Sequence, residues 1–381
     1  MKNPQEQEIA ELRRQIRELK KENFNLKLNS SINLATAMVM SEEFGCDLEV
    51  YKKSRWYDIA HAVTEKLPES MRMKVVPVCR ALGHSRQSYY KERKVRQRKA
   101  VDEALIVEFV VSARIDHPRC GVRKLCVYIR EDLKRAGIKV GRDRLFEILR
   151  IHDMLVERRK AFVPHTAHWD RSLPVSLNLL ADRIVDGPNQ VFVADITYIR
   201  LADRFVYLSL VSDYFSKDIV GWFLADDLGH DGPVKALEMA RGIVPEGVVV
   251  IHHSDRGCQY ACGEFLSRLK AFGMLSSMTE ELHCYENSVA ERINGILKDE
   301  YYLNVEFKDK DEALKAVARA IEVYNGRRVH ESLGYRTPAY ARANPDTVRE
   351  GLVAIQLAAQ ERRRKFAEDR AKREAKTVEA A

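Results

Sequence analysis

The stretch VFVADITYIR, residues 191–200, joins a run of β-forming apolar residues to a single acidic residue, Asp195. Val193, Ile196 and Ile199 predict a strand that is buried on both faces. An ionised carboxylate in such a strand costs free energy unless it meets a cation or a hydrogen-bond network. Asp195 taken alone therefore indicates either a metal ligand or an ordinary buried aspartate held by hydrogen bonds.

The sequence around this stretch predicts an α/β domain. Apolar β-rich runs follow at residues 205–211, 218–224 and 248–253, and amphipathic helices are expected at 232–243, 262–272 and 287–300. Three strands, a helix, a strand and further helices are typical of a sheet covered by helices. We expect this domain to occupy residues 188–345.

Two more acidic residues stand where such a domain places ligands. Asp255, in HHSDRGCQY, follows an apolar run and so lies just past the carboxyl end of a strand, where open α/β sheets bind ligands. A loop aspartate that only shapes a turn is the alternative. Glu291, in YENSVAERINGILKDEY, lies on a polar helix stripe, for which a solvated helix face is the alternative. The other members of this stripe are Asn287, Asn294 and Lys298.

Carboxylates from two strands and one helix can together hold a pair of Mg²⁺ or Mn²⁺ ions. Such a pair catalyses phosphodiester cleavage and strand joining. We therefore take Asp195, Asp255 and Glu291 as candidate catalytic and metal-binding residues.

The composition favours a polyanionic partner. The chain has 381 residues, a formal net charge of +8 and a pI near 9.0, which suits DNA without establishing DNA binding by itself. Its seven cysteines are irregularly spaced and indicate a reduced, cytoplasmic chain. The N-terminus is polar, and no apolar run approaches the length of a membrane span. We expect a nucleoid-associated protein without a membrane partner.

The first expected region, residues 1–53, begins with a short heptad repeat. Its core positions alternate at spacings of three and four: Ile9, Leu12, Ile16, Leu19, Asn23 and Leu26. Ile at position a, Leu at position d and one Asn at position a favour a parallel two-stranded coiled coil. We expect a homodimer or higher oligomer formed through residues 8–27, and the alternative is an amphipathic helix packed on its own chain.

Two helical regions follow, and each is a candidate for DNA binding. The first is residues 54–95, within which the segment 67–94 predicts two short helices around Gly83. Ser85 caps the second, as in a helix-turn-helix or a plain helical hairpin. Residues 96–162 predict three helices, of which the last is basic. The basic residues outside its apolar stripe are Arg142, Arg144 and Arg150. This pattern suits the major groove of DNA, and a bundle used only for packing is the alternative.

Two further segments carry weaker patterns. Residues 163–187 lack periodicity and contain prolines, so we expect a linker. Residues 346–381 form a charged tail that is helical or disordered. A solvated tail is the plain expectation for it, with DNA contact as the alternative.

The three acidic contexts together resemble the motifs of one family, the bacterial insertion-sequence transposases of the IS-three group. PNQVFVADITYI resembles the first-aspartate motif of their retroviral-integrase-like catalytic core, IHHSDRGCQY the second, and ENSVAERINGILKDEY the glutamate motif. YNGRRVHESLGYRTP, residues 324–338, resembles the end-of-domain signature of the family. The region around HPRCGVRKL resembles the helix-turn-helix that precedes the core.

This resemblance implies a ribonuclease-H-like fold and a DNA transposase that cleaves and joins DNA at the ends of an insertion sequence. It implies that Asp195, Asp255 and Glu291 are the metal-binding triad, with two divalent ions as cofactors. It also implies that Lys298 contacts the transposon end. The partner would be double-stranded DNA, as terminal repeats and as target.

Complete fusion transposases of the family that it resembles begin with a further helix-turn-helix before the zipper, whereas this sequence starts almost at the heptad repeat. We therefore expect a downstream-frame, internally initiated or truncated product that could act with an upstream-frame protein of the same element. Two alternatives stay open. One is a non-catalytic DNA-binding regulator or inhibitor acting through the coiled coil, and the other is a ribonuclease-H-like nuclease without strand transfer.

Overall fold

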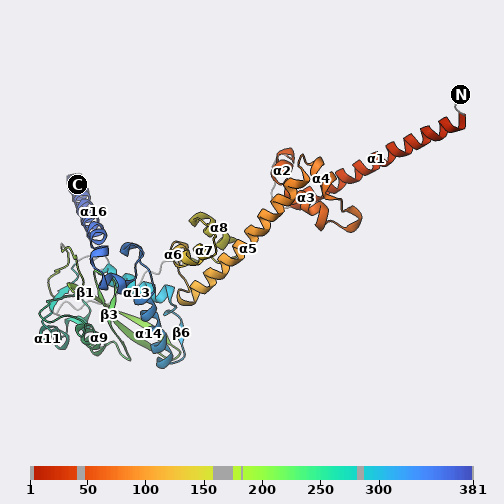
Figure 1. Ribbon diagram of the computed structural model, residues 1–381. Helices are drawn as coiled ribbons and strands as arrows, with labels where there is room; N and C mark the ends of the chain where they lie inside the picture. The colour runs from red at the N-terminus through yellow and green to blue at the C-terminus, as the bar shows by residue number, and fades with distance from the viewer. Residues whose placement is uncertain (1–3, 41–47, 158–174, 182, 281–286, 380–381) are drawn as a thin grey trace. The chain divides into compact units, whose positions relative to one another are not determined.

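The computed structural model describes residues 4–40, 48–157, 175–181, 183–280 and 287–379 (Figure 1). The chain divides into two compact units, Met1–Leu105 and Ile106–Ala381. Helix α5 (Arg86–Asp116) begins in the first unit and ends in the second.

The first unit is built from helices. The long helix α1 (Pro4–Val39) is followed by α2 (Leu48–Ser54), α3 (Trp56–His61), the π-helical turn η1 (Ala62–Lys66), the 3-10 turn η2 (Glu69–Met71) and α4 (Val75–Ala81). The second half of α1 buries Leu28, Ile32 and Ala35 in a core shared with α3 and α4. The apolar residues of the first half of α1 lie outside this core: Ile9 is 49% and Leu26 65% exposed. The predicted heptad stripe is therefore uncovered within one chain.

The predicted turn between the two helices of residues 67–94 is confirmed. Gly83 has a φ of +78°, which favours glycine, and the amide of Ser88 donates to Ser85 Oγ at 3.1 Å. The prediction that both helices are short is wrong for the second, because α5 has 31 residues. No glycine or proline interrupts residues 86–116, so the boundary expected between residues 95 and 96 falls inside a continuous helix.

The second unit opens with three short helices after the end of α5. These are α6 (Val122–Tyr128), α7 (Arg130–Arg135) and α8 (Arg142–Ile151). The single helix expected over 122–133 is split into α6 and α7 at Ile129. Leu125, Leu145 and Ile148 are fully buried in one core with residues of α5. The expected basic third helix is α8, which begins after Gly141.

A mixed six-stranded sheet forms the centre of the second unit. Its strands are β1 (Val191–Leu201), β2 (Phe205–Asp213), β3 (Ile219–Ala225), β4 (Ile251–Ser254), β5 (Leu275–Met278) and β6 (Glu306–Phe307). The order is β3-β2-β1-β4-β5, and β6 pairs with β1. The first three strands are antiparallel, whereas β1, β4 and β5 are parallel. The four strands expected from the sequence are confirmed, although β4 is shorter than the apolar run 248–253.

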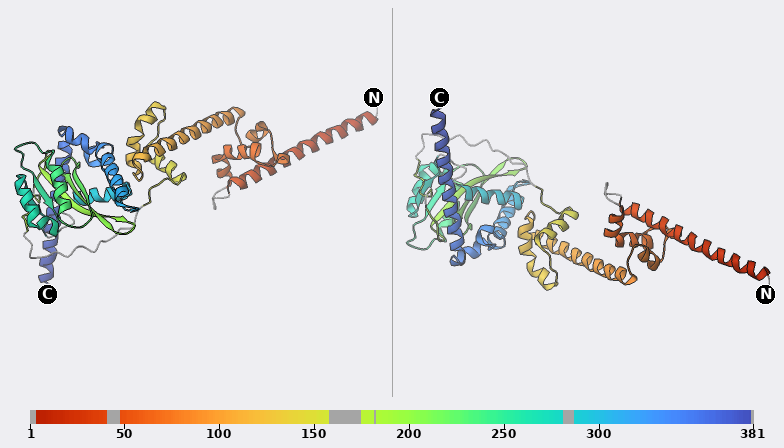
Figure 2. Two further views of the ribbon diagram at one scale, coloured as in Figure 1. Left: turned by 90° about the horizontal axis from the view of Figure 1, so that it is seen from below. Right: turned by 90° about the horizontal axis from the view of Figure 1, so that it is seen from above.

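Helices cover both faces of this sheet (Figure 2). One face packs against α9 (Asp231–Arg241), α10 (Cys258–Ala261) and α11 (Gly263–Ala271). The other face packs against α13 (Ser288–Glu300) and α14 (Lys310–Gly326). Burial on both faces explains why β1 is nearly continuous in apolar residues.

The segments on either side of the sheet domain also pack on it. The chain ends with the 3-10 turn η3 (Glu331–Leu333), α15 (Pro338–Ala343) and α16 (Asp346–Glu379). Val348 and Leu352 of α16 are buried, and Gln356 exchanges hydrogen bonds with the backbone of Val185 at 2.8 and 2.9 Å. The first turns of the expected solvated tail are thus part of the core. Among the described helices, none has the length and apolar character that crossing a membrane requires.

Candidate active site

Asp195 and Asp255 lie level with each other on neighbouring strands. In the parallel ladder between β1 and β4, Val193 pairs with His253. Two residues further along each chain stand Asp195, still inside β1, and Asp255, just past the end of β4. Paired strands run about 4.8 Å apart, so the register brings these two carboxylates to one edge of the sheet. Asp255 is held in its turn by an amide hydrogen bond from Gly257 at 3.0 Å.

Helix α13 places Glu291 against the same part of β1. Asn294 Nδ2 donates to Asp195 Oδ2 at 2.9 Å, and Asn287 Nδ2 donates to the backbone oxygen of Ala194 at 2.9 Å. Glu291 lies between these two asparagines on the stripe, one turn from each. Asn287 and Asn294 are buried, so the alternative of a solvated helix face is wrong for these two residues, whereas Glu291 itself is exposed.

The carboxylates affect one another electrostatically. Burial, and then the negative charge of Asp255, raise the pKa of Asp195 to about 7, although hydrogen bonds from Asn294 and the amide of Ile196 act in the opposite direction. Partial burial and the charge of Asp255 also raise the pKa of Glu291. Negative charge is therefore concentrated at these three carboxylates. Carboxylate oxygens in such a cluster suit a hard divalent cation, so these three residues could hold one or two such ions.

Tyr260 is a neighbour of the site that was not among the residues expected there. It lies in α10, its hydroxyl is buried, and that hydroxyl has no hydrogen-bond partner among the described residues. Burial and the charges of Asp255 and Asp195 raise its pKa well above the usual value, so the phenol stays neutral. Tyr260 closes the HHSDRGCQY motif, and this proximity in sequence was the available signal.

Lys298 lies further along the polar stripe of α13. Its Nζ is 4.3 Å from the centroid of the Tyr198 ring of β1. Burial lowers its pKa, and the charge of Asp195 partly offsets that effect. The structure therefore brings Lys298 into the surroundings of Asp195, as the stripe predicts.

The three arginines of α8 lie apart from this cluster. Arg142, Arg144 and Arg150 are exposed, whereas Leu145 and Leu149 of the same helix are buried. Arg142 and Arg144 form ion pairs with acidic residues of their own helix at 2.9 and 2.8 Å. Exposed intrahelical pairs of this kind are weak and leave the arginines available to another anion.

One further group of possible metal ligands was not expected from the sequence. Single donor atoms of His230, Cys262 and Glu264 lie within 4.8 Å of one another. His252 and His253, which stand near cysteines in the sequence, are instead buried in β4, and His253 Nδ1 lies 2.9 Å from Ser277 Oγ. Glu264 is exposed and well solvated, so we assign no metal to this group.

The fold and the site define an integrase-type polynucleotidyl transferase core. Two family models described as "Integrase core domain" match residues 185–284 and 273–338. The chain belongs to the IS3 family of insertion-sequence transposases. It is 30% identical over 273 residues to the transposase InsF for insertion sequence IS3A of Escherichia coli K12, covering 68% of this chain and 91% of the relative.

Other relatives agree with this membership. The transposase for insertion sequence element IS629 of Shigella sonnei is 31% identical, with 70% of this chain and 90% of the relative covered. The IS600 31 kDa protein of the same species is 32% identical, with 69% and 96% covered. Among solved structures, the HTLV-2 integrase catalytic core with magnesium is 18% identical with a TM-score of 0.33, covering 40% of this chain and 96% of that one.

Proposed function

We propose that the chain cleaves DNA at the ends of an insertion sequence and joins the ends to new DNA, with Asp195, Asp255 and Glu291 as the catalytic triad. The observation that carries this proposal is the docking of α13 on β1 through Asn287 and Asn294. In this arrangement Glu291 would face the two aspartates, which the parallel register supports as neighbours. Membership in a family of transposases supports the same reaction class.

The proposed step is an in-line displacement at phosphorus. Water is the nucleophile in cleavage and a DNA 3′-hydroxyl is the nucleophile in joining, and in each case one P–O bond forms as another breaks. Two divalent cations, Mg²⁺ or Mn²⁺, would supply a lowered pKa for the nucleophile and charge neutralisation for the leaving oxygen. The three carboxylates would hold these ions. Asn294 would fix the orientation of Asp195, so the contribution of the protein is chiefly positioning.

We assign DNA contacts to two groups of cations. Lys298 stands beside the carboxylates on α13, where a phosphate next to the cleaved bond would pass. Arg142, Arg144 and Arg150 project from α8, the basic third helix of a helix-turn-helix. A helix of this type inserts into the major groove, and its arginines then contact phosphates or base edges.

We also propose that α1 forms a coiled coil with a second copy of the chain. The stripe formed by Ile9, Leu12, Ile16 and Leu19 is between 49% and 63% exposed. An uncovered apolar stripe at heptad spacing is the feature that a partner helix buries. Transposition joins two DNA ends, so a dimer would give each end its own catalytic core.

The test uses the whole chain, Mg²⁺ and DNA that carries the terminal repeats of the element. Wild-type protein is expected to give nicked and joined products, whereas Glu291→Gln and Asp195→Asn should lower both by a factor of about 1,000 or more, as loss of a metal ligand does. Glu350→Gln, which changes an exposed glutamate of α16, is the matched control. Cleavage that survives Glu291→Gln would refute the triad. Nicks without joining would identify a nuclease, and bound but uncut DNA a regulator.

A further inference from the structure

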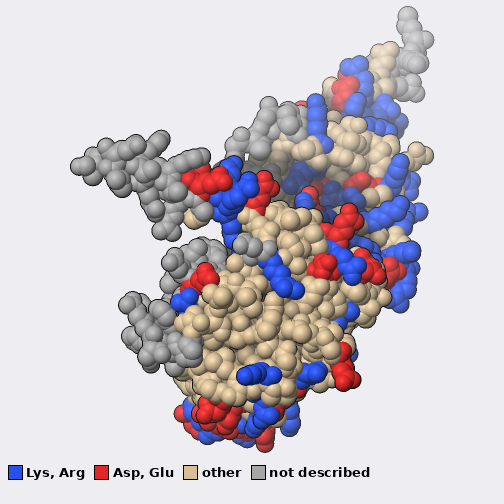
Figure 3. All heavy atoms as spheres, turned by 90° about the vertical axis from the view of Figure 1, so that its left-hand side faces the viewer, with Lys and Arg blue, Asp and Glu red and all other residues tan. Residues whose placement is uncertain are grey.

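The net charge of +8 is not spread evenly over the surface. In the view of Figure 3 the middle of the visible face carries few charged side chains, and Lys, Arg, Asp and Glu gather towards its edges. On this face charge is therefore concentrated in clusters, and clusters of cations are candidates for DNA contact. One such cluster lies away from the carboxylates, at the start of α13.

This cluster lines a cavity of about 280 Å³ within the second unit. Ser288, Val289 and Arg292 from the first turns of α13 form one wall. The cations in the remaining lining are Lys124, Lys217 and Arg328. On the helical wheel this wall lies on the opposite side of α13 from the stripe that carries Glu291. The cavity is thus separate from the carboxylate site.

The described lining of the cavity holds four cations, Lys124, Lys217, Arg292 and Arg328, and one acidic residue, Glu331. Glu300 accepts hydrogen bonds from Arg328 at 2.8 Å and from Lys124 at 2.7 Å, so a single carboxylate is shared by two cations. Lys217 donates only to the backbone oxygen of Tyr214 in the described part of the chain. Arg292 is exposed and forms no salt bridge with any residue that the structure describes.

The pKa of a buried histidine reflects the same excess of positive charge. His330 is 9% exposed and lines the cavity. Burial, followed by the charges of Arg328, Lys124, Lys217 and Arg292, holds its pKa well below the usual value. The neutral ring accepts a hydrogen bond from Arg328 Nη1 at 2.7 Å. Four cations are therefore close enough to act on one side chain.

The amino end of α13 adds hydrogen-bond donors to these charges. Asn287 precedes the helix but does not cap it, because its side chain donates to Ala194 instead. Ser288 and Val289, whose amides belong to the uncapped first turn, line the cavity. The amides of the first turn lie at the positive end of this 13-residue helix, which favours an anion.

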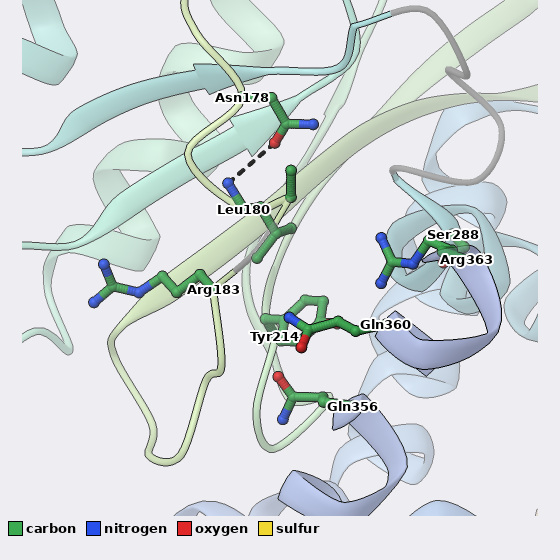
Figure 4. Close-up of a pocket in the computed structure, with 9 residues that line it drawn as sticks. Asn178, Leu180, Arg183, Tyr214, Ser288, Gln356, Gln360 and Arg363 are labelled. Carbon is green, nitrogen blue, oxygen red and sulfur yellow. Dashed lines mark hydrogen bonds between the residues drawn. The ribbon is translucent and has the colours of Figure 1, made fainter. Parts of the chain in front are cut away.

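A second, smaller hollow shares one lining residue, Ser288, with the first. Figure 4 shows it between Arg183, Tyr214, Gln356, Gln360 and the start of α13, with Arg363 of α16 beside Ser288. Tyr214 lines the second hollow and also contacts Lys217 of the first cavity, whose Nζ lies 4.3 Å from the centroid of the Tyr214 ring. Among the residues that the structure describes, those lining the second hollow include no aspartate or glutamate.

We propose that the cavity at the start of α13 binds a phosphate group of the DNA backbone through Arg292, Lys217 and the first amides of the helix. This inference rests on the proposed function insofar as DNA is the partner. The shared chemistry is that of a phosphate oxyanion, and a free phosphate ion is the other source. The second hollow, with Arg183 and Arg363, would receive the DNA strand where it leaves the cavity.

The test measures DNA binding in EDTA, where no cleavage occurs, by fluorescence anisotropy at salt concentrations from about 50 to about 200 mM. Arg292→Ala should weaken binding by a factor of about ten at low salt, for every DNA sequence alike, and lower the slope of log K against log salt by about one. Arg292→Lys should restore most of the slope. Lys315→Ala, an exposed cation of α14 away from both hollows, should leave the slope unchanged.

Inorganic phosphate separates the two sources. If the cavity holds a backbone phosphate, added phosphate should compete with DNA for wild-type protein more strongly than an equal ionic strength of chloride, and lose that advantage in Arg292→Ala. An unchanged salt slope in Arg292→Ala would overturn the proposal, whatever effect phosphate has on the protein. Because no step depends on catalysis, failure here leaves the triad untouched, and failure of cleavage leaves this result interpretable.

Discussion

Asn294 is the side chain that connects α13 to the first carboxylate. Its amide nitrogen is 2.9 Å from Asp195 Oδ2, and its amide oxygen is buried without a partner in the described part of the chain. A buried amide acceptor left without a hydrogen bond costs about 1–3 kcal/mol. Such a group is retained where it serves a ligand or a site rather than stability. We therefore treat Asn294 as a positioning residue.

Replacing Asn294 by leucine should separate positioning from folding. The substitution keeps the shape but removes a hydrogen bond to a carboxylate, a contact worth about 1.5–3 kcal/mol. We expect DNA cleavage to fall by roughly ten- to a hundredfold at saturating DNA, while DNA affinity in EDTA and the melting temperature stay near wild type. Unchanged cleavage would remove Asn294 from the site.

At the scale of elements, the close packing of α9 on β3 depends on one glycine. A Cβ added at Gly221 would lie 2.0 Å from the backbone oxygen of Ala236 and 2.9 Å from the amide of Ala240. Backbone atoms cannot yield as the end of a side chain can, so the helix would have to move off the sheet.

Gly221→Ala should therefore lower the free energy of unfolding by more than about 3 kcal/mol, at or above the usual cost of overpacking. Gly295→Ala is the matched control, because nothing lies within 4 Å of its added Cβ. In the middle of α13 that change should stabilise the protein by up to about 1 kcal/mol. Urea unfolding of both variants decides between the two effects, and equal midpoints would contradict the close contact.

The amino half of α1 is an element whose partner is another chain in our proposal. Asn23 occupies a core position of the heptad, where a polar residue restricts the coil to two strands in register. Asn23→Val should raise the stability of the coiled coil and broaden its oligomeric state beyond the dimer. Sedimentation velocity of the whole chain measures this, with Asn344→Ala as an exposed control outside the heptad. An Asn23→Val profile that matches wild type at all concentrations would count against the coiled coil.

At the scale of the whole molecule, three buried histidines tie stability to pH. Burial lowers the pKa of His117 to about 4 and that of His252 to about 3, and holds that of His330 well below its usual value. Each ring is neutral when folded and protonates near pH 6.5 when unfolded. Since the folded pKa is depressed, the stability is complete above about pH 6.5 and is lost as the pH falls toward the folded pKa.

Each such histidine should steepen the loss of stability by about 1.4 kcal/mol per pH unit below about pH 6.5. His252 packs against the rings of Tyr260 and Phe265, so His252→Phe fits the same space without a proton to gain. Urea unfolding at about pH 7.5 and about pH 5.5 should show a pH dependence shallower by about one proton. His152→Phe, at an exposed position after α8, should keep the wild-type slope. Equal slopes in both variants would contradict a neutral His252.

Local signals in the sequence determined much of the secondary structure of this protein. Apolar runs located the first three strands, Ser85 and Gly83 located a cap and a turn, and helical periodicity put Glu291 with Asn294 on one stripe. These features depend on the conformation of a few neighbouring residues, which composition and spacing record directly. The strand β6 was missed because two residues are too few for a period to show. The strand β5 was missed because its two central residues are serines and no apolar run marks it.

Only the tertiary structure decided which element packs against each buried face. The pairing of β1 with β4 makes Asp195 and Asp255 level, and the hydrogen bond from Asn294 brings α13 to them. The cavity around Ser288 joins Lys217, Arg292 and Arg328, which are far apart in the chain. A periodic pattern shows that a face is covered but not by what, because strand register and helix docking are fixed by contacts between segments distant in sequence. The residue types of the site could therefore be predicted from the sequence, whereas their common location depends on the fold.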